Sequence, residues 1–427
     1  MSPQQQSSGV EVNLHSLPTE LVVHICSFLP VKFVRRVFLL VCRRFHVIFS
    51  ADSLWMVRLM NRFPRVKYPE KFVSSPVFEW VRVCDAIESE YHRWVFTRRK
   101  HATDSSTSPP EPSHVPDFVL SGGHFACVDA VHLMRSPATH KQLCLSGSRD
   151  RGIAVWDIDV LGKRQPHSVD DHELSAKSRV HLRESAHTGW IWNIGSVEDR
   201  AYSTGWDCYV KEWQLNNGHL EPISSHKMSA AVVSLLLSNQ NTIIAGSYDQ
   251  KITVVDPRDM QNQVAQFKHH NGPVLSIAGP EHASTYIYSS AEDRTVVCTD
   301  QRTWRVVTSR TLPQYATSLS YGQHSLWAST SRGYICLLDP HRHGLPSIVN
   351  LHVSNRRSVQ HLVHSLGSVM CVGSDRYLHI YMPDRTAKPL QKFGRFHAEP
   401  TRLAYQHGNL VCAFSDSTIG VWNDIEQ

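Results

Sequence analysis

Residues 146–157 read SGSRDRGIAVWD, a turn of small residues followed by an aspartate and an alternating apolar strand. Six later segments repeat this arrangement: STGWDCYVKEWQ (203–214), AGSYDQKITVVD (245–256), SSAEDRTVVCTD (289–300), ASTSRGYICLLD (328–339), VGSDRYLHIYMP (372–383) and AFSDSTIGVWND (413–424). The aspartate position, which holds Arg332 in the fifth segment, recurs at intervals of 57, 42, 44, 39, 43 and 41 residues. Five of these six intervals match the ~40–45-residue period of a propeller blade, so the sequence predicts seven blades.

The spacing inside each segment tests this prediction. Three residues after the aspartate position, all seven segments carry an aliphatic residue: Ile153, Val210, Ile252, Val296, Ile335, Leu378 and Ile419. Two residues further on, six of seven side chains are apolar or a thiol, and Glu212 is the exception. A strand buried between neighbouring blades requires such alternation. We therefore predict a propeller over residues 118–427, closed by residues 118–120 pairing with the last blade, and a polar surface loop at 163–180.

Bulk composition excludes several classes of protein. The chain has 427 residues, of which 41% are hydrophobic and 19% charged, as in soluble globular proteins. It has no run of eighteen apolar residues and no N-terminal secretory signal, so we expect no membrane association. Its ten cysteines stand singly, without metal-binding spacing. We expect free thiols, no metal, and a reducing compartment, the cytoplasm and/or the nucleus.

The N-terminal region is helical in pattern and basic in charge. Residues 14–60 contain three short apolar-periodic runs, the third from Cys42 to near Trp55, with more apolar surface than so small a bundle can bury. Residues 1–100 carry fifteen Lys and Arg against eight Asp and Glu, a balance of +7, whereas the whole chain has +6. This balance predicts an acidic protein partner. Nucleic acid is disfavoured because no DNA- or RNA-binding motif is present.

Composition also suggests the domain boundaries. Residues 78–97 form an amphipathic helical pattern, and a Ser-, Thr- and Pro-rich stretch follows. We expect a disordered tail at 1–13, a helical domain at 14–60, a linker-helix region at 61–97, a flexible linker at 98–117 and the propeller at 118–427.

The N-terminal domain and the repeats each resemble a known family. The N-terminal domain resembles an F-box through Leu17-Pro18-Thr19-Glu20-Leu21, Ile25, Leu29, the Val41–Phe45 segment and Leu54-Trp55. The repeats resemble WD repeats. Together they resemble the F-box/WD-repeat protein family, which implies an α plus all-β fold: a three-helix F-box and linker helix before a seven-bladed WD-repeat propeller.

The WD resemblance implies six structural pairs in which a histidine bonds the turn aspartate. They are His124–Asp150, His187–Asp207, His226–Asp249, His270–Asp293, His352–Asp375 and His397–Asp416. The fifth repeat has Arg332 and lacks the histidine as well, as expected if a lone buried partner is costly. We assign these residues to structure and not to metal binding or catalysis.

The family resemblance implies a non-catalytic substrate-recognition subunit of a Skp adaptor–cullin–F-box (SCF-type) ubiquitin ligase, monomeric within the complex and without a cofactor. The expected adaptor contacts are Leu17, Pro18, Leu21, Ile25, Leu29, Val41 and Cys42. The alternative for this surface is that some of these residues only hold the helices together. The alternative function is a ligase-independent WD-repeat scaffold. An enzyme is disfavoured because no paired carboxylates, phosphate loop or nucleophile elbow occur.

The target, a protein or phosphoprotein, is expected on the propeller face that carries the aspartate turns. The candidate target-binding residues are Arg149, Trp190, Trp206, Tyr248, Arg332, Arg376 and Arg402. They suggest an aromatic side in blades two and three and a basic side, with Arg356 and Arg357, in blades five to seven. An acidic or phosphorylated peptide lying across both sides is one hypothesis. Solvated arginines and blade-packing tryptophans are the alternative.

Overall fold

The computed structural model describes residues 17–63, 79–100, 116–162, 171–238, 242–280, 285–322, 325–355 and 357–423, and the description of 96–100 and Asp171 covers their backbone alone. The chain divides into two compact units, Met1–Arg93 and Trp94–Gln427. The expected tail at 1–13, most of the expected linker at 98–117, and Arg356 lie outside the described residues.

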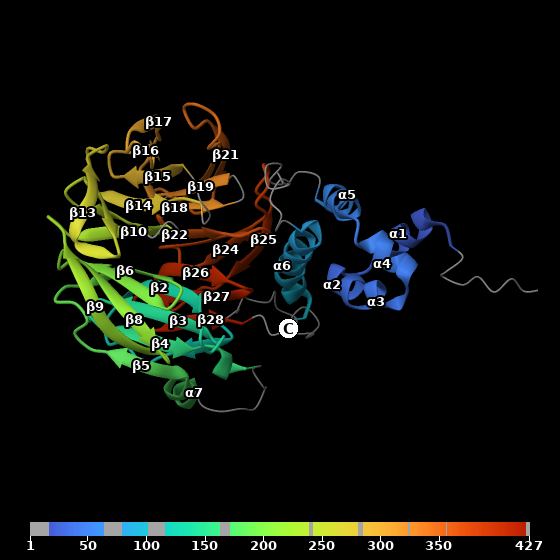
Figure 1. The fold of residues 1–427 in the computed structure, drawn as a ribbon, viewed down its shortest axis with the longest axis horizontal. Helices are drawn as coiled ribbons and strands as arrows, with labels where there is room; N and C mark the ends of the chain where they lie inside the picture. Colours follow the sequence, from blue (N-terminus) through green and yellow to red (C-terminus); the bar gives the residue numbers. More distant parts are fainter. Residues whose placement is uncertain are drawn as a thin grey trace, which may run out of the picture. The chain divides into compact units, whose positions relative to one another are not determined.

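The first unit consists of short helices. They are α1 (Thr19–Ser27), α2 (Val31–Phe33), the π-helical turn η2 (Val34–Phe38), α3 (Leu39–Val41), α4 (Arg43–Phe49), α5 (Asp52–Arg62) and the first part of α6 (Trp80–Lys100) (Figure 1). Pro30 separates α1 from α2, because proline cannot continue a helix. The third predicted helix is two helices. Ala51 has an extended backbone (φ −78°, ψ 116°), and Asp52 begins α5 with a carboxylate at its N-terminus.

A buried ion pair connects the helices of this unit. The guanidinium of Arg58 donates to both carboxylate oxygens of Glu88, at 2.8 and 3.0 Å. The same guanidinium donates to the carbonyl oxygens of Cys26 and Leu29, at the end of α1. Because both charged groups are buried and bonded to each other, removing either would leave an unpaired charge in the core. This pair therefore fixes α5 and α6 against the end of α1.

The second unit is a seven-bladed propeller of four-stranded antiparallel sheets, as predicted. In chain order, blades one to three contain β2 (Val128–Arg135), β3 (Gln142–Ser148), β4 (Ile153–Asp157) and β5 (Arg179–Arg183); β6 (Ile191–Val197), β7 (Arg200–Gly205), β8 (Tyr209–Asn216) and β9 (His219–Lys227); and β10 (Val232–Ser238), β11 (Thr242–Ser247), β12 (Ile252–Asp256) and β13 (Asp259–Phe267). Blades four to six contain β14 (Val274–Ala278), β15 (Tyr286–Ala291), β16 (Thr295–Asp300) and β17 (Val306–Thr311); β18 (Ala316–Gly322), β19 (Ser325–Thr330), β20 (Tyr334–Leu338) and β21 (Ser347–His352); and β22 (Val359–His364), β23 (Val369–Gly373), β24 (Leu378–Tyr381) and β25 (Pro389–Phe393).

The seventh blade closes the ring with a strand from before the first. It comprises β26 (Pro400–Gln406), β27 (Asn409–Phe414), β28 (Ile419–Trp422) and β1 (Phe118–Leu120), and Val119 pairs with Gly420. In Figure 1 the red strands β26 and β27 lie beside the green-cyan strand β2 of blade one, which they contact. This closure is the predicted one, and it removes the free edge of the last sheet.

The insertion in blade one is more ordered than the predicted polar loop. Its described residues form a short 3₁₀ helix (Asp159–Leu161), the helix α7 (Asp171–Ser178) and the strand β5. The buried hydroxyl of Ser175 in α7 donates to the carbonyl of Val119 and accepts from the backbone N–H of Ser121, and Leu174 packs against the blade core. The helix therefore forms because it covers and anchors the closing strand β1.

The first strands of the blades form a closed ring around the axis. They are β2, β6, β10, β14, β18, β22 and β26, each in contact with the next and the last with the first. Each carries a bulge after its first residue, so that the register passes from Val128 to Ala130 in blade one and from Pro400 to Arg402 in blade seven. A bulge changes the direction of the side chains beside it. It therefore decides which side chains meet near the axis.

Candidate functional site

The WD hydrogen-bond network is complete in blades one and two. In blade two, His187 Nδ1 donates to the Asp207 carboxylate at 2.9 Å, and its Nε2 lies 2.6 Å from Ser203 Oγ. The indole N–H of Trp213 also donates to Ser203 Oγ. Burial by itself raises the pKa of Asp207, but the hydrogen bonds from His187 and from two backbone N–H groups lower it overall. Blade one repeats this network with His124, Asp150, Ser146 and Trp156.

Three of the six predicted pairs are present and three are wrong. His124–Asp150, His187–Asp207 and His270–Asp293 are hydrogen-bonded, at 3.0, 2.9 and 3.3 Å. The other three histidines have different contacts: His226 bonds the Met260 carbonyl, His352 packs on the Tyr334 ring, and the His397 carbonyl accepts from Arg376. The aspartates predicted as their partners form hydrogen bonds with nearby groups instead: Asp249 with Ser229, Asp375 with His379 and Asp416 with Thr418.

The distance from the histidine to the first strand explains these errors. His124, His187 and His270 each stand four residues before the first strand of their blade. In the other blades this position holds Met228, Leu312, Asn355 and Phe396. Three of these four are buried apolar residues, so packing replaces the polar network there. Spacing to the aspartate alone did not reveal this difference.

The aspartate turns and the loops that enter the first strands share one face of the propeller, the turn face. The backbone N–H groups of Arg149, Trp206 and Tyr248 donate to the carbonyls of Cys127, Trp190 and Ala231. Each of these carbonyls belongs to the residue immediately before the first strand of its blade. These bonds hold the residue before each turn aspartate next to the entry loop of its own blade. They therefore place the predicted target residues of blades one to three on this face.

Four rings on the turn face form the aromatic cluster: Trp190, Trp192, Trp206 and Tyr248. The Trp206 ring lies 6.1 Å from Trp190, 6.2 Å from Trp192 and 5.8 Å from Tyr248, centroid to centroid. Trp190, Trp206 and Tyr248 remain 45%, 41% and 51% exposed. Large rings held together yet open to solvent are typical of binding surfaces. Here the structure brings together the aromatic residues that the sequence predicted.

Arg149 joins the aromatic cluster through an ion pair. Its guanidinium lies 5.0 Å from the Trp190 ring centroid and donates to both carboxylate oxygens of Asp129, at 2.7 and 3.2 Å. Asp129 was missed in the sequence, where nothing but its place after the first residue of a blade's first strand marks it. The ion pair balances the charge of Arg149 and holds its guanidinium beside the ring.

The arginines of the predicted basic side each have contacts of their own. Arg402 in β26 donates through Nη1 to the Trp192 carbonyl at 3.3 Å, so it lies with the aromatic cluster. Arg376 donates a hydrogen bond to the His397 carbonyl, and Arg357 donates one to the Ser374 carbonyl. Arg332 is exposed in the turn of blade five. Arg402 therefore lies beside the aromatic cluster, and the basic side in blades five to seven stays a prediction.

The predicted adaptor residues are largely accessible on the helical unit. Pro18, Leu21, Ile25 and Val41 are exposed, whereas Leu17, Leu29 and Cys42 are half-buried. The half-buried ones also have structural contacts: the Leu17 carbonyl accepts from Arg44, and Cys42 Sγ accepts from the Phe45 N–H. The bond from Arg44 brings the start of α1 to the start of α4, beside Val41.

Two exposed residues of this surface were missed. Phe28 and Leu40 are 76% and 82% exposed, the highest values among the large apolar residues of the described helices. Leu21, Ile25 and Phe28 follow at helical spacing on α1, so the same periodicity could have included Phe28. An apolar stripe that the helices leave uncovered indicates a partner surface.

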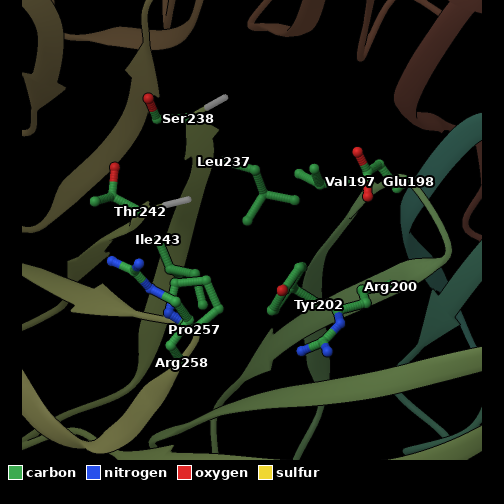
Figure 2. A pocket seen from close by; sticks show the side chains of 10 residues that line it. All are labelled: Val197, Glu198, Arg200, Tyr202, Leu237, Ser238, Thr242, Ile243, Pro257 and Arg258. Atoms are coloured by element: carbon green, nitrogen blue, oxygen red, sulfur yellow. The ribbon is translucent and has the colours of Figure 1, made fainter. Parts of the chain in front are cut away.

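A pocket of about 240 Å³ lies between blades two and three on the face opposite the turn face (Figure 2). Val197 and Leu237, near the far ends of β6 and β10, contribute to its lining. Arg200 and Arg258 stand on its two sides, but each is paired with a carboxylate, Glu212 and Asp256 respectively. The pocket brings together no nucleophile with a base, so it offers no evident catalytic site.

The described residues also bear on metal binding and on membrane crossing. Histidine, cysteine and carboxylate side chains there form no group of three or more that could bind a metal ion. None of the helices described combines the length and the apolar character that crossing a membrane requires.

Comparison with known proteins agrees with both units. The F-box-like family matches residues 14–59, and the WD domain, G-beta repeat family matches residues 261–300. F-box/WD repeat-containing protein 9 of Homo sapiens is 29% identical over 97% of this chain and 84% of its own length. F-box/WD repeat-containing protein mec-15 of Caenorhabditis elegans is 29% identical over 95% of both chains. A ribosome biogenesis protein, ytm1 of Botryotinia fuckeliana, is 26% identical over 51% of this chain.

Proposed function

The chain joins an F-box-like segment to a seven-bladed WD-repeat propeller, the architecture of the F-box/WD-repeat proteins, and from this premise we propose that it is the substrate-recognition subunit of an SCF-type ubiquitin ligase. The helical unit binds the Skp adaptor, and the propeller holds the target. The chain itself performs no chemistry. It raises the concentration of a target beside the ubiquitin-charged enzyme, an advantage set by geometry.

The observation that carries the adaptor half of this proposal is the exposed apolar surface of α1 and α3. Leu21, Ile25, Phe28, Leu40 and Val41 present apolar side chains to solvent although the unit has a formed core beneath them. An acidic adaptor would also be attracted by the positive balance of residues 1–100. All ten cysteines are free thiols, which supports a reducing compartment, the cytoplasm or the nucleus.

The target half of the proposal rests on the aromatic cluster. Three of its four rings are exposed, and Arg149 is held beside them by its ion pair, so a bound segment would lose little to side-chain ordering of the receptor. Target proteins would be found by proximity labelling with the full chain under proteasome inhibition. A Trp206→Ala chain should lose those that depend on the cluster, and retention of every labelled protein would contradict this location.

Adaptor binding is tested by a matched pair of valines. Val41 and Val57 are both about half exposed, at 53% and 50%, but only Val41 belongs to the proposed surface. In a pull-down of the Skp adaptor by the full chain, Val41→Ser should weaken binding about tenfold, because a central apolar contact becomes polar. Val57→Ser should bind as the parent does. Equal binding by all three chains would place the adaptor contact away from Val41, and no binding by the parent chain would favour the ligase-independent WD-repeat scaffold.

A further inference from the structure

Two histidines face each other between the outer strands of blades one and two. His181 belongs to β5 and His219 to β9, and these two strands are in contact at the rim of the propeller (Figure 1). Nδ1 of His181 lies 3.2 Å from Nδ1 of His219. Neither residue belongs to the predicted structural pairs or to the predicted target-binding residues. The proposed function therefore leaves this contact unexplained.

The hairpin between β8 and β9 brings His219 to His181. Asn217 and Gly218 form its two-residue turn with positive φ angles of 50° and 87°, the conformation of a type I′ turn. A Cβ atom at position 218 would collide with the side chain of Val180 in β5. Glycine at this position therefore lets the hairpin approach β5 closely enough for the two rings to meet.

The geometry of the two rings fits two ligands of one ion better than a straight hydrogen bond. Two nitrogens bound at ~2.0–2.1 Å to a tetrahedral ion lie about 3.3–3.4 Å apart, and two bound at right angles lie about 2.8–3.0 Å apart. The distance of 3.2 Å between the Nδ1 atoms is nearer to the tetrahedral value. In a straight N–H···N bond of that length the ring centroids would lie about 5.4 Å apart. The observed centroids are 4.9 Å apart, with the ring planes at 63°.

The fold gives the polar atoms of His181 little else to bind. The residue is half-buried, and its Nε2 is enclosed without a hydrogen-bond partner among the described residues. An apolar side chain would fill this position without leaving a polar atom unpaired. Two Nδ1 atoms so close cannot both carry a proton, so at least one presents a lone pair. His219 is exposed, which gives an ion access to both nitrogens from solvent.

We propose that His181 and His219 bind a zinc ion through their Nδ1 atoms and thereby link blades one and two. Imidazole nitrogens are common zinc ligands. No group of three or more metal-binding side chains forms among the described residues, so water completes the coordination. Sequence spacing does not reveal the pair, since 38 residues separate its members. The site goes beyond the proposed ligase function and does not depend on it, because neither histidine belongs to the adaptor surface or the aromatic cluster.

One nearby charge opposes the ion. Arg183 lies opposite Ile153, and His181 lies opposite Val155, so the two side chains leave β5 on the same side. The positive charge of Arg183 acts on the His181 ring. Two protein ligands and this repulsion set a modest affinity, with a Kd on the order of 10 µM. Zinc therefore binds the rim reversibly.

The test is calorimetric titration of the full chain with Zn²⁺ at pH 7, where imidazole is mostly neutral. His219→Asn should weaken binding at one site about tenfold or more, because a single imidazole remains. His140→Asn, which removes another exposed histidine, should titrate as the parent does. Because both substituted residues are exposed, both variants should keep the thermal midpoint of the parent without zinc.

Two further variants test the geometry without removing a ligand. Gly218→Ala should weaken zinc binding about tenfold, because the added methyl group pushes the hairpin away from Val180. Arg183→Gln should bind zinc several-fold more tightly, because a repelling charge is removed. Cobalt adds a spectroscopic readout: Co²⁺ bound to the parent should show the intense visible absorption of a tetrahedral ion, and His219→Asn should lose it.

Each outcome bears on the site. Zinc binding undiminished by His219→Asn would assign the ion to other histidines and overturn the proposal. A parent chain that binds no zinc below about 1 mM would overturn it as well, since the two rings would then share only a hydrogen bond. Weaker binding by His219→Asn together with tighter binding by Arg183→Gln supports the site.

Thermal unfolding gives an independent measure of the link between the blades. Zinc should raise the thermal midpoint of the parent and leave that of His219→Asn unchanged, because the folded ring alone holds both ligands in place. An equal rise in both chains would contradict the link. None of these results changes the expected pull-down of the adaptor, so the two proposals fail independently.

Discussion

At the scale of single residues, each turn aspartate keeps a side-chain donor, whether or not its blade has the histidine of the network. Blade two has His187 with Asp207, and blade five has Leu312 at the histidine position and Arg332 at the aspartate position. A buried carboxylate without its donor is costly, whereas replacing both partners by compatible groups can be nearly neutral. The mixed blades agree with this rule, since Asp249 obtains a bond from Ser229 and Asp375 from His379.

A double-mutant cycle in blade two tests this coupling. His187→Leu, which copies blade five, should lower the free energy of unfolding by about 2–3 kcal/mol, because Asp207 keeps its buried charge without its main donor. The double variant His187→Leu/Asp207→Ser should lose less than the two single variants summed. His226→Leu is the control, since it removes one bond to a carbonyl, at about 1 kcal/mol. Strictly additive losses in urea unfolding would contradict the coupling.

The same scale shows what the sequence could and could not predict. The turn aspartates and the aliphatic residues after them could be predicted from the sequence, because the same pattern recurs in seven segments. The approach of Arg402 to Trp192 could not be predicted, because a contact between blades far apart in the chain depends on ring closure. The role of Asp129 could not be predicted, because a bulge in β2 decides the direction of its side chain. The histidine position was readable only by counting back from the first strand, whose start the sequence does not mark sharply.

At the scale of elements, the short strand β1 has a larger effect than its three residues suggest. Phe118 and Leu120 are buried in the cluster shared by blades seven and one, whereas Val119 between them is half-buried. The helix α7 holds the strand from outside through Ser175. Sequence predicted the pairing but not α7, because the helix owes its stability to the surface that it covers.

The closing strand offers a comparison between neighbouring positions. Leu120→Ala should lower the free energy of unfolding by about 2–4 kcal/mol, because it opens a cavity in a buried cluster. Val119→Ala, on the other side of the same strand, should cost under about 1 kcal/mol. Urea unfolding of the full chain measures both. Equal losses at the two positions would show that β1 contributes by backbone pairing alone.

At the scale of the whole molecule, the propeller contains five histidines whose side chains are buried or half-buried in the fold. Burial lowers the pKa of His132, His187, His270, His361 and His364 below the usual value. In the unfolded chain the same groups titrate near pH 6.5. Below that pH the unfolded chain therefore binds protons that the folded chain does not, and stability is lost as the pH falls.

The resulting pH dependence is specific in sign and range. The free energy of unfolding should decrease between pH 7 and pH 5, by up to about 1.4 kcal/mol per pH unit for each histidine that stays neutral in the fold. His364→Asn should make this slope shallower, whereas the exposed His140→Asn should leave it unchanged. A parent chain equally stable at pH 7 and pH 5 would contradict the assignment of these rings as neutral and buried.

The pairing of Leu120 with Ile419 has a consequence for synthesis on the ribosome. The two partners are separated by about 300 residues, so β1 emerges first and waits for almost the entire chain before its neighbour exists. Until then the nascent ring is open and β1 has no sheet to join. A stall late in translation would therefore release a chain with six formed blades and one unmatched edge, a form prone to pairing with another copy.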